Sequence, residues 1–292
     1  MTAGGTGGQR AGLAFSLIRK RSTATACGAA PFPLDQRLPP VLYICIPTHN
    51  EAPTIGLVLW RIRKLFAEFP REYELLVYND GSTDATAEVL GPYAEVLPLA
   101  VLGGSHRVGY GAAIDALFRA ALARCRYPRR DAVILMQGDL TDRAEQIPEL
   151  VKRFEGGADV VVGQAVTDDS EPVPVRRLRR AARWITRSLN TVQGVDDPLG
   201  SFHLFRLTVL RDALRASGDQ PLAAGDGWAV NVELLQATVP HARRMEAICT
   251  QPRFDLRPRA SRVRPLRDAL RFYRFSREAR ARRPRLRLAE PS

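Results

Sequence analysis

Short apolar segments alternate with helical patterns over residues 41–162, and this alternation limits the folds that the chain can adopt. Each segment is too short and too uniformly apolar for a helix, so it reads as a buried strand. These strands are predicted at Val41–Ile46, Glu74–Tyr78, Val96–Leu102, Ala132–Met136 and Asp159–Val162. Strands joined through a helix over roughly 30 residues pair in parallel, with helices on both faces of the sheet. We therefore predict an α/β fold with a mostly parallel sheet.

The pattern changes after Gly163, which marks a second, C-terminal region. The helices and strands predicted there are Arg176–Asn190, Ser201–Phe205, Trp228–Ala237 and Met245–Ile248. We expect residues 1–38, which are rich in Gly, Ala and Thr, to be disordered. Residues 39–262 would form the α/β domain. Residues 263–292 would form a basic amphipathic tail helix, with one face carrying Arg264, Arg267, Arg271 and Arg274.

The net charge of +12 comes almost entirely from arginine, since the only lysines are Lys20, Lys64 and Lys152. Guanidinium groups suit phosphate oxygens, although GC-rich coding would also enrich arginine. No helix-turn-helix, zinc or RNA-binding signature accompanies the charge, so we expect no nucleic-acid partner. No stretch approaches the roughly 20 apolar residues of a membrane span, and no secretory signal is evident. Four cysteines without a CxxC pair fit a reduced compartment, so we expect a cytoplasmic location.

Polar clusters follow three of the predicted strands directly: His49-Asn50-Glu51, Asn79-Asp80 and Gln137-Gly138-Asp139. Ligands of parallel sheets bind beyond the carboxyl ends of the strands, so the clusters should converge on one crevice. Carboxylates there suit hydroxyls, nucleobase N–H groups or a divalent metal. Each acid also has a simpler explanation: a first-turn acid at Glu51, a turn residue at Asp80 and a helix cap at Asp139. Three clusters in register favour the ligand site.

Several strings of the sequence match a known series of motifs in the same order. IPTHNE resembles I-P-x-Y-N-E, and VYNDGSTDAT resembles V-D-D-G-S-x-D-x-T. RVGYGAAIDALFRAAL is similar to N-x-G-x-G-x-A-x-x-x-G, and MQGDLTDRAEQIPEL to M-D-A-D-L-x-x-x-P-E-x-I-P-x-L. Later matches are DVVVGQA, DDPLGSFHLFR, GWAVNVELL and FDLRPRASR. The series resembles that of family 2 glycosyltransferases, closest to the dolichyl-phosphate mannose synthase and polyprenyl-phosphate glycosyltransferase branch. The resemblance covers about Val41 to Ser261 and implies that the region after Gly163 is the acceptor side.

The resemblance implies a GT-A (Rossmann-like) fold, a nucleotide-diphosphate sugar donor and Mg²⁺ or Mn²⁺. It places the donor against Pro47, Thr48, His49, Glu51, Asn79, Asp80 and Gly109. It assigns the metal to Asp139 with Gln137, and the reacting phosphates to Asp139, Asp197 and Arg257. The acceptor would be polyprenyl phosphate or another acceptor, and the sugar would transfer by inverting, metal-assisted displacement. A phosphate acceptor is already anionic near pH 7, so this reaction needs no strong general base.

Several residues depart from the family pattern. His49 stands for Tyr, Asn79 and Gln137 each stand for the first Asp of a pair, and Ala165 stands for Arg. Gly200-Ser201 inverts the usual Ser-Gly, and Asn231 occupies an often acidic position. The alternative hypothesis is therefore a catalytically degenerate relative that binds nucleotides or lipid headgroups. A nucleotidyltransferase is a weaker alternative. It would need a Gly-rich, Lys- or Arg-bearing loop directly after the first strand, and the PTHNE string there has no such residues.

The arginine-rich helical segments have two interpretations. They are either solvated helix faces or a basic amphipathic surface that docks on anionic lipid, where each arginine contributes about 1 kcal/mol. A lipid-linked acceptor favours docking, so we expect peripheral attachment at the inner face of the membrane.

Overall fold

The computed structural model describes residues 40–166, 171, 173–189, 195, 197–224, 227–256 and 270, all within the compact unit Pro39–Ser292. The predicted disordered segment, Arg257 and all of the predicted tail except Leu270 lie outside the described residues.

Seven strands form one sheet in the order β3-β2-β1-β4-β6-β5-β7. Their bounds are β1 Val41–Thr48, β2 Glu72–Asp80, β3 Leu99–Gly104, β4 Ala132–Leu135, β5 Val160–Ala165, β6 His203–Arg206 and β7 Met245–Thr250. Neighbours pair in parallel except β6, which is antiparallel to both β4 and β5. The mostly parallel sheet is thus confirmed. Predicted strand Val96–Leu102 is shifted, because Val96 is the last residue of the preceding helix.

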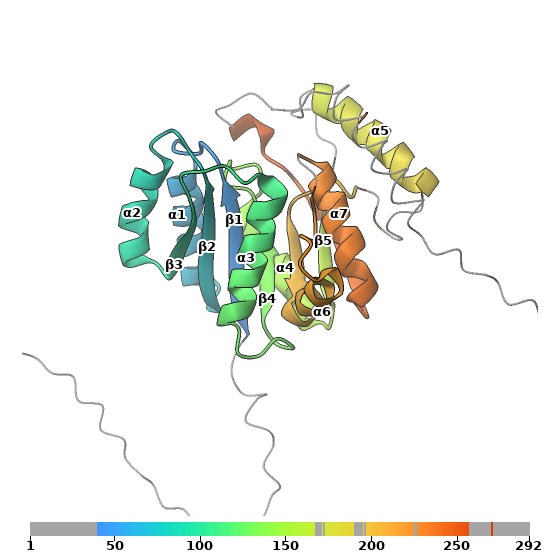
Figure 1. The fold of residues 1–292 in the computed structure, drawn as a ribbon, viewed down its shortest axis with the longest axis horizontal. Coiled ribbons are helices and arrows are strands. Elements are labelled where there is room, and N and C mark those ends of the chain that lie inside the picture. The colour runs from blue at the N-terminus through green and yellow to red at the C-terminus, as the bar shows by residue number, and fades with distance from the viewer. Residues whose placement is uncertain are drawn as a thin grey trace, which may run out of the picture. The chain divides into compact units, whose positions relative to one another are not determined.

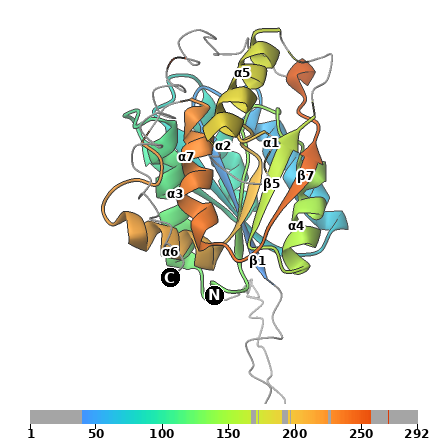
Figure 2. The ribbon, with the colours of Figure 1, turned by 90° about the vertical axis from the view of Figure 1, so that its right-hand side faces the viewer.

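Helices cover both faces of this sheet, as predicted. Their bounds are α1 Ile55–Glu68, α2 Thr86–Val96, α3 Tyr110–Arg124, α4 Ile147–Glu155, α5 Val173–Leu189, α6 Leu207–Ser217 and α7 Ala229–Thr238. The short 3₁₀ helices are η2 Ala144–Gln146, η3 Val239–His241 and η4 Phe254–Leu256. Figures 1 and 2 show α3, α6 and α7 on one face and α1 and α4 on the other.

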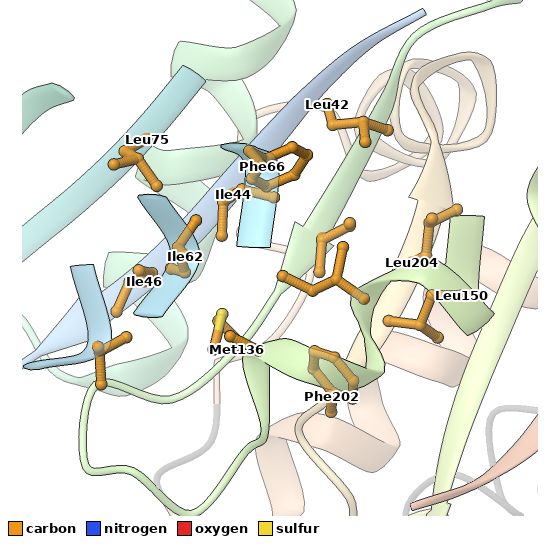
Figure 3. Packing of buried hydrophobic residues seen from close by; sticks show 14 of the residues in the cluster. Leu42, Ile44, Ile46, Ile62, Phe66, Leu75, Met136, Leu150, Phe202 and Leu204 are labelled. Atoms are coloured by element: carbon orange, nitrogen blue, oxygen red, sulfur yellow. The ribbon is translucent and has the colours of Figure 1, made fainter. Parts of the chain in front are cut away.

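Two buried clusters, one on each face, hold the helices to the sheet. Alternate residues of β1 point to opposite faces, so Leu42 and Ile44 join one cluster while Tyr43 and Cys45 join the other. Figure 3 shows the first cluster, where β1 side chains pack with Phe66 of α1 and neighbouring residues. Burial on both faces explains why the strand sequence is continuously apolar rather than alternating.

The parallel strands β1, β2 and β4 run in the same direction, so their carboxyl ends lie at one edge of the sheet. At this edge Thr48 pairs with Asn79, and the chain leaves β4 after Leu135 toward the third polar cluster. Helix α5 lies beyond the same edge, apart from the helices that cover the faces of the sheet (Figure 2).

Candidate donor and metal site

The loops after β1 and β2 are joined by hydrogen bonds between side chains and backbone. Asn50, at a φ of 56°, donates its backbone N–H to Ser82 Oγ at 2.9 Å and accepts from Thr83 N at 2.8 Å through its side chain. Glu51 N donates to Thr86 Oγ1 at 3.0 Å. The N-D-G-S-T-D-A-T string is therefore a clamp that fixes the loop carrying His49 and Glu51.

Asn79 serves the turn within this clamp. Its Oδ1 accepts a hydrogen bond from the backbone N–H of Ser82, three residues on, at 3.2 Å, a local bond from side chain to backbone that stabilises the turn. An amide oxygen does this as well as a carboxylate oxygen, which explains how Asn replaces the usual Asp. A nucleotide sugar that contacts Asn79, as predicted from the sequence, would therefore lie next to this hydrogen bond.

Asp80 holds the loop that leads into α3. Its Oδ1 accepts from Val108 N at 2.6 Å, and both its oxygens lie within reach of Gly109 N, at 3.2 and 3.1 Å. Arg107 Nε lies 3.6 Å from Asp80 Oδ2. Gly109 adopts a φ of 95°, which favours glycine. The two predicted residues Asp80 and Gly109 thus meet, and His49 joins them because its Nδ1 donates to the Asp80 carbonyl at 2.7 Å.

Thr54 connects the first cluster with the third. Its hydroxyl donates to the Gly138 carbonyl at 2.8 Å and lies 3.1 Å from Glu51 Oε2. Gly138 has no room for a side chain, since a Cβ would lie 2.9 Å from Thr48 Cγ2. The Thr48 hydroxyl in turn donates to the Tyr78 carbonyl at 2.9 Å, and Pro47 pairs with Tyr78 in the sheet. The structure therefore brings together the predicted β1, β2 and β4 loops.

The loop after β4 carries the predicted metal residues. Asp139 is buried, and its Oδ1 accepts from Thr141 N at 3.0 Å. The side-chain amide of Gln137 donates to the Tyr110 hydroxyl at 2.6 Å, which donates to Asn231 Oδ1 at 3.2 Å. The Gln137 amide nitrogen is thus engaged by α3, and its amide oxygen is the atom that could meet a cation.

Asp142 belongs to the same loop and was not predicted. Its Oδ2 accepts from Gln137 N at 2.8 Å and from Ser201 Oγ at 3.1 Å. Burial raises the pKa of Asp142 to about 7, the nearby Asp139 adds to this rise, and Arg179 opposes it. A second acid three residues after Asp139 was the available sequence signal.

These oxygen donors fit a hard divalent cation. Within the described part of the chain, no three His, Cys, Asp or Glu side chains form a metal cage. Mg²⁺ and similar ions do not require one, because one or two carboxylates and the phosphates of a bound substrate complete the shell. Asp139, Asp142 and the Gln137 amide lie on one loop and carry oxygen atoms of the type that such a partial shell uses.

Asp197 lies on the other side of the site. It is fully buried, its Oδ1 accepts from Leu199 N at 3.3 Å, and its Oδ2 lies 3.5 Å from Arg179 Nη1 of α5. Its carboxylate is thus directed at α5, while Arg257 lies outside the described residues. The inverted Gly200-Ser201 has a steric reason: a Cβ at Gly200 would lie 2.6 Å from the Gly163 carbonyl, while Ser201 reaches Asp142.

Comparison with known proteins decides the family. The model of "Glycosyl transferase family 2" matches residues 43–214. The chain belongs to glycosyl transferase family 2. Its matched region ends at the last turn of α6 and contains all three clamped loops together with Asp142, Arg179 and Asp197.

Curated members of family 2 match part of the chain. The bactoprenol glucosyl transferase of Shigella phage SfX is 27% identical over 172 residues, which are 58% of this chain and 53% of that protein. The undecaprenyl-phosphate 4-deoxy-4-formamido-L-arabinose transferase of Pseudomonas aeruginosa (strain LESB58) is 34% identical over 131 residues, 45% and 36% of the two chains. The chain thus spans about half the length of the first of these relatives and about a third of the second.

Solved structures confirm the GT-A fold of this family 2 member. Glucosyl-3-phosphoglycerate synthase from Mycobacterium tuberculosis, in complex with Mn²⁺, uridine-diphosphate and glucosyl-3-phosphoglycerate, matches with a TM-score of 0.56 and 20% identity over 85% of this chain and 82% of that one. Mannosyl-3-phosphoglycerate synthase from Rubrobacter xylanophilus matches with a TM-score of 0.57 and 19% identity over 86% and 77% of the two chains.

Proposed function

We propose that this chain transfers a sugar from a nucleotide-diphosphate sugar to polyprenyl phosphate. The observation that carries the proposal is the clamped edge of the sheet, where Glu51, Asp80 and Asp139 occupy connected loops within a family 2 domain. The names of two relatives, a bactoprenol and an undecaprenyl-phosphate sugar transferase, support the acceptor class.

Each loop has a part in this proposal. The nucleoside would lie against Pro47–His49 and the loop that Asp80 holds, and the diphosphate would lie toward Asp139. Asp139, with Asp142 and the Gln137 oxygen, would hold Mg²⁺ or Mn²⁺, which when bound neutralises charge developing on the leaving diphosphate. Arg257 would face the phosphate groups. The acceptor phosphate attacks the anomeric carbon in line, so the configuration inverts and the nucleoside diphosphate leaves.

The acceptor is lipid-linked in this proposal, so we also propose peripheral attachment at the cytoplasmic face of the membrane. No helix among the described residues is long and apolar enough to cross a bilayer. Arg177 and Arg180 are exposed on α5, at the edge of the sheet that carries the donor loops. Arginines near anionic lipid contribute about 1 kcal/mol each. Flotation with anionic and neutral vesicles tests this step, and salt-insensitive or absent binding to anionic vesicles contradicts it.

The direct test is transfer by the purified chain. It is incubated with a panel of UDP- and GDP-sugars, short polyprenyl phosphates and Mn²⁺ or Mg²⁺, and lipid-linked sugar is measured beside free sugar from donor hydrolysis. We expect transfer with one donor class that requires the metal and is lost in Asp139→Asn. Failure of both transfer and hydrolysis across the panel contradicts the proposal.

A second candidate, binding without transfer, is favoured by one observation: the neutral Gln137, at the position where the family motif that the sequence resembles has an Asp, donates to the Tyr110 hydroxyl. Gln137→Asp separates the two functions. In a degenerate protein the added charge would raise Mn²⁺ affinity and create activity. In an active enzyme whose Gln137 orients Tyr110, it would lower existing activity, which is the result we expect.

A further inference from the structure

A buried guanidinium lies between α5 and the loop before β6. The side chain of Arg179 is only 10% exposed, and its partners Glu171 and Asp197 are 2% and 1% exposed. Arg179 Nε lies 3.2 Å from Glu171 Oε1, and its Nη1 lies 3.5 Å from Asp197 Oδ2. One planar cation thus contacts two buried carboxylates from different segments.

Two aromatic rings enclose the same guanidinium. Its carbon lies 5.8 Å from the ring centroid of Trp228, directly before α7, and 5.7 Å from that of Phe254 in η4. Both distances are within the range of cation–π attraction. Arg179 therefore joins α5 to segments that are far apart in sequence, whereas the adjacent Arg180 is exposed.

Residues 197–201, which Arg179 contacts through Asp197, are also linked by hydrogen bonds to the loop after β4, which carries Asp139 and Asp142. Asn231 Nδ2 donates to the Leu199 carbonyl at 2.9 Å, and the same Asn231 accepts from Tyr110, the partner of Gln137. Ser201 donates to Asp142 at 3.1 Å. A shift of residues 197–201 would therefore move the partners of Gln137 and Asp142.

Removing the guanidinium would leave the carboxylate of Asp197 buried without its counter-charge. Such a group either takes up a proton or moves toward water. In either case residues 197–201 would lose their present position, and small displacements near a reacting centre are costly.

We propose that Arg179 is a positioning residue: through Asp197 it fixes residues 197–201 and, through Ser201 and Asn231, the loop that carries Asp139 and Asp142. The effect on catalysis rests on the proposed transferase function. The effect on loop order does not, so the two can be tested apart.

The first experiment needs no activity. Amide hydrogen exchange is compared among wild type, Arg179→Met and the matched surface control Arg180→Met. We expect faster exchange in residues 197–202 and 137–142 of Arg179→Met alone, at conditions where the strands of the sheet remain protected. Unchanged exchange in both segments, or equal change in Arg180→Met, overturns the proposal.

The second experiment separates positioning from simple stabilisation. If wild type transfers sugar, we expect Arg179→Met to lower kcat by about 100-fold with the donor KM nearly unchanged, and added guanidinium ion to restore part of it. Arg179→Lys should remain impaired, because one ammonium cannot reach both carboxylates in the way a guanidinium fork does. Full kcat in a folded Arg179→Met, or a kcat loss that added guanidinium does not relieve, contradicts the proposal. If wild type itself is inactive, the proposed function fails and hydrogen exchange alone decides.

Discussion

We call the loops after β1, β2 and β4, where we propose that the nucleotide sugar binds, the donor side, and α5 with the residues around Arg179 the acceptor side. The two sides are held together by different forces. On the donor side, the loops are joined by directional hydrogen bonds, such as those of Asp80 with Val108 N at 2.6 Å and of Thr54 with the Gly138 carbonyl at 2.8 Å. On the acceptor side, α5 is held through ion pairs and aromatic rings around Arg179.

This difference has consequences for how each side can respond. Directional hydrogen bonds fix a geometry, so the donor loops are formed before a ligand arrives. Ion pairs and cation–π contacts tolerate larger displacements and depend on nearby charge. Under the proposed function, α5 could therefore adjust its position at an anionic lipid, whereas the donor loops would present one arrangement to the nucleotide sugar.

Asp139→Asn should produce the largest effect, because it removes a carboxylate from the loop after β4, where we propose that the metal binds, while keeping the acceptor for Thr141 N. We expect transfer to fall by about 100- to 1,000-fold, since a bound metal stabilises the transition state by several kcal/mol. Metal-dependent thermal stabilisation should also be lost, with the melting temperature without metal nearly unchanged. If Mn²⁺ still stabilises Asp139→Asn against thermal unfolding, the metal does not bind through Asp139 on the donor side.

The next largest effect is expected at His203, the first residue of β6, which follows the segment that carries Asp197 and Ser201. It is fully buried, and this burial outweighs the backbone groups of Gly200 and Phe202, which favour the charged ring. Burial lowers the pKa of His203 to about 4. The unfolded chain therefore binds more protons than the folded chain between this value and the ordinary pKa of about 6.5. Stability is full above about pH 6.5 and falls as pH falls toward the folded pKa.

His203→Leu tests this through urea unfolding at several pH values. Asp142 shifts the opposite way, because its folded pKa is raised, so the difference between variant and wild type is the quantity to follow. We expect this difference to change by about 3 kcal/mol in favour of the variant between pH 7 and pH 4. If the unfolding free energies of variant and wild type change in parallel with pH, the start of β6 accommodates a charged imidazole.

The sequence was sufficient for the sheet and for the three donor loops, because their signals are local. Apolar runs mark strands, and Gly, Asn and Asp at strand ends mark turns. Most of the donor residues named from the sequence do meet, including Glu51 with the Gly138 loop and Asp80 with Gly109.

Residues whose roles depend on distant contacts were not identifiable in this way. Arg179 looks like one arginine among several on a basic helix, and only the fold brings it to Asp197. Asp142 appears in the sequence only as a second acid three residues after Asp139, and its role depends on Ser201, 59 residues later, which donates a hydrogen bond to it. Burial and pairing of charged groups follow from tertiary structure, which periodicity does not encode.

Thr54→Val should sharpen the comparison with a moderate effect. It removes the hydroxyl that donates to the Gly138 carbonyl within the interior and keeps the side-chain shape. We expect unfolding free energy to fall by about 1–2 kcal/mol, the cost of leaving a buried acceptor unsatisfied. Thr83→Val removes an exposed hydroxyl of the same clamp and should cost less. An equal loss in both variants would show that the donor loops do not depend on the buried bond.

Asn79→Asp should have the smallest effect, and that small effect is informative. The acceptor for Ser82 N is kept, and the neighbouring Asp80 is already stabilised by the backbone N–H groups of Val108 and Gly109. We expect a stability change within about 0.5 kcal/mol and an unchanged donor KM, measured by urea unfolding and transfer kinetics. A clear gain in donor affinity would instead mean that residue 79 contacts the nucleotide and that its charge matters. The hydrogen bonds of the donor side would then not be enough to form it fully before the ligand binds. The donor and acceptor sides would differ less in how far each is formed in advance.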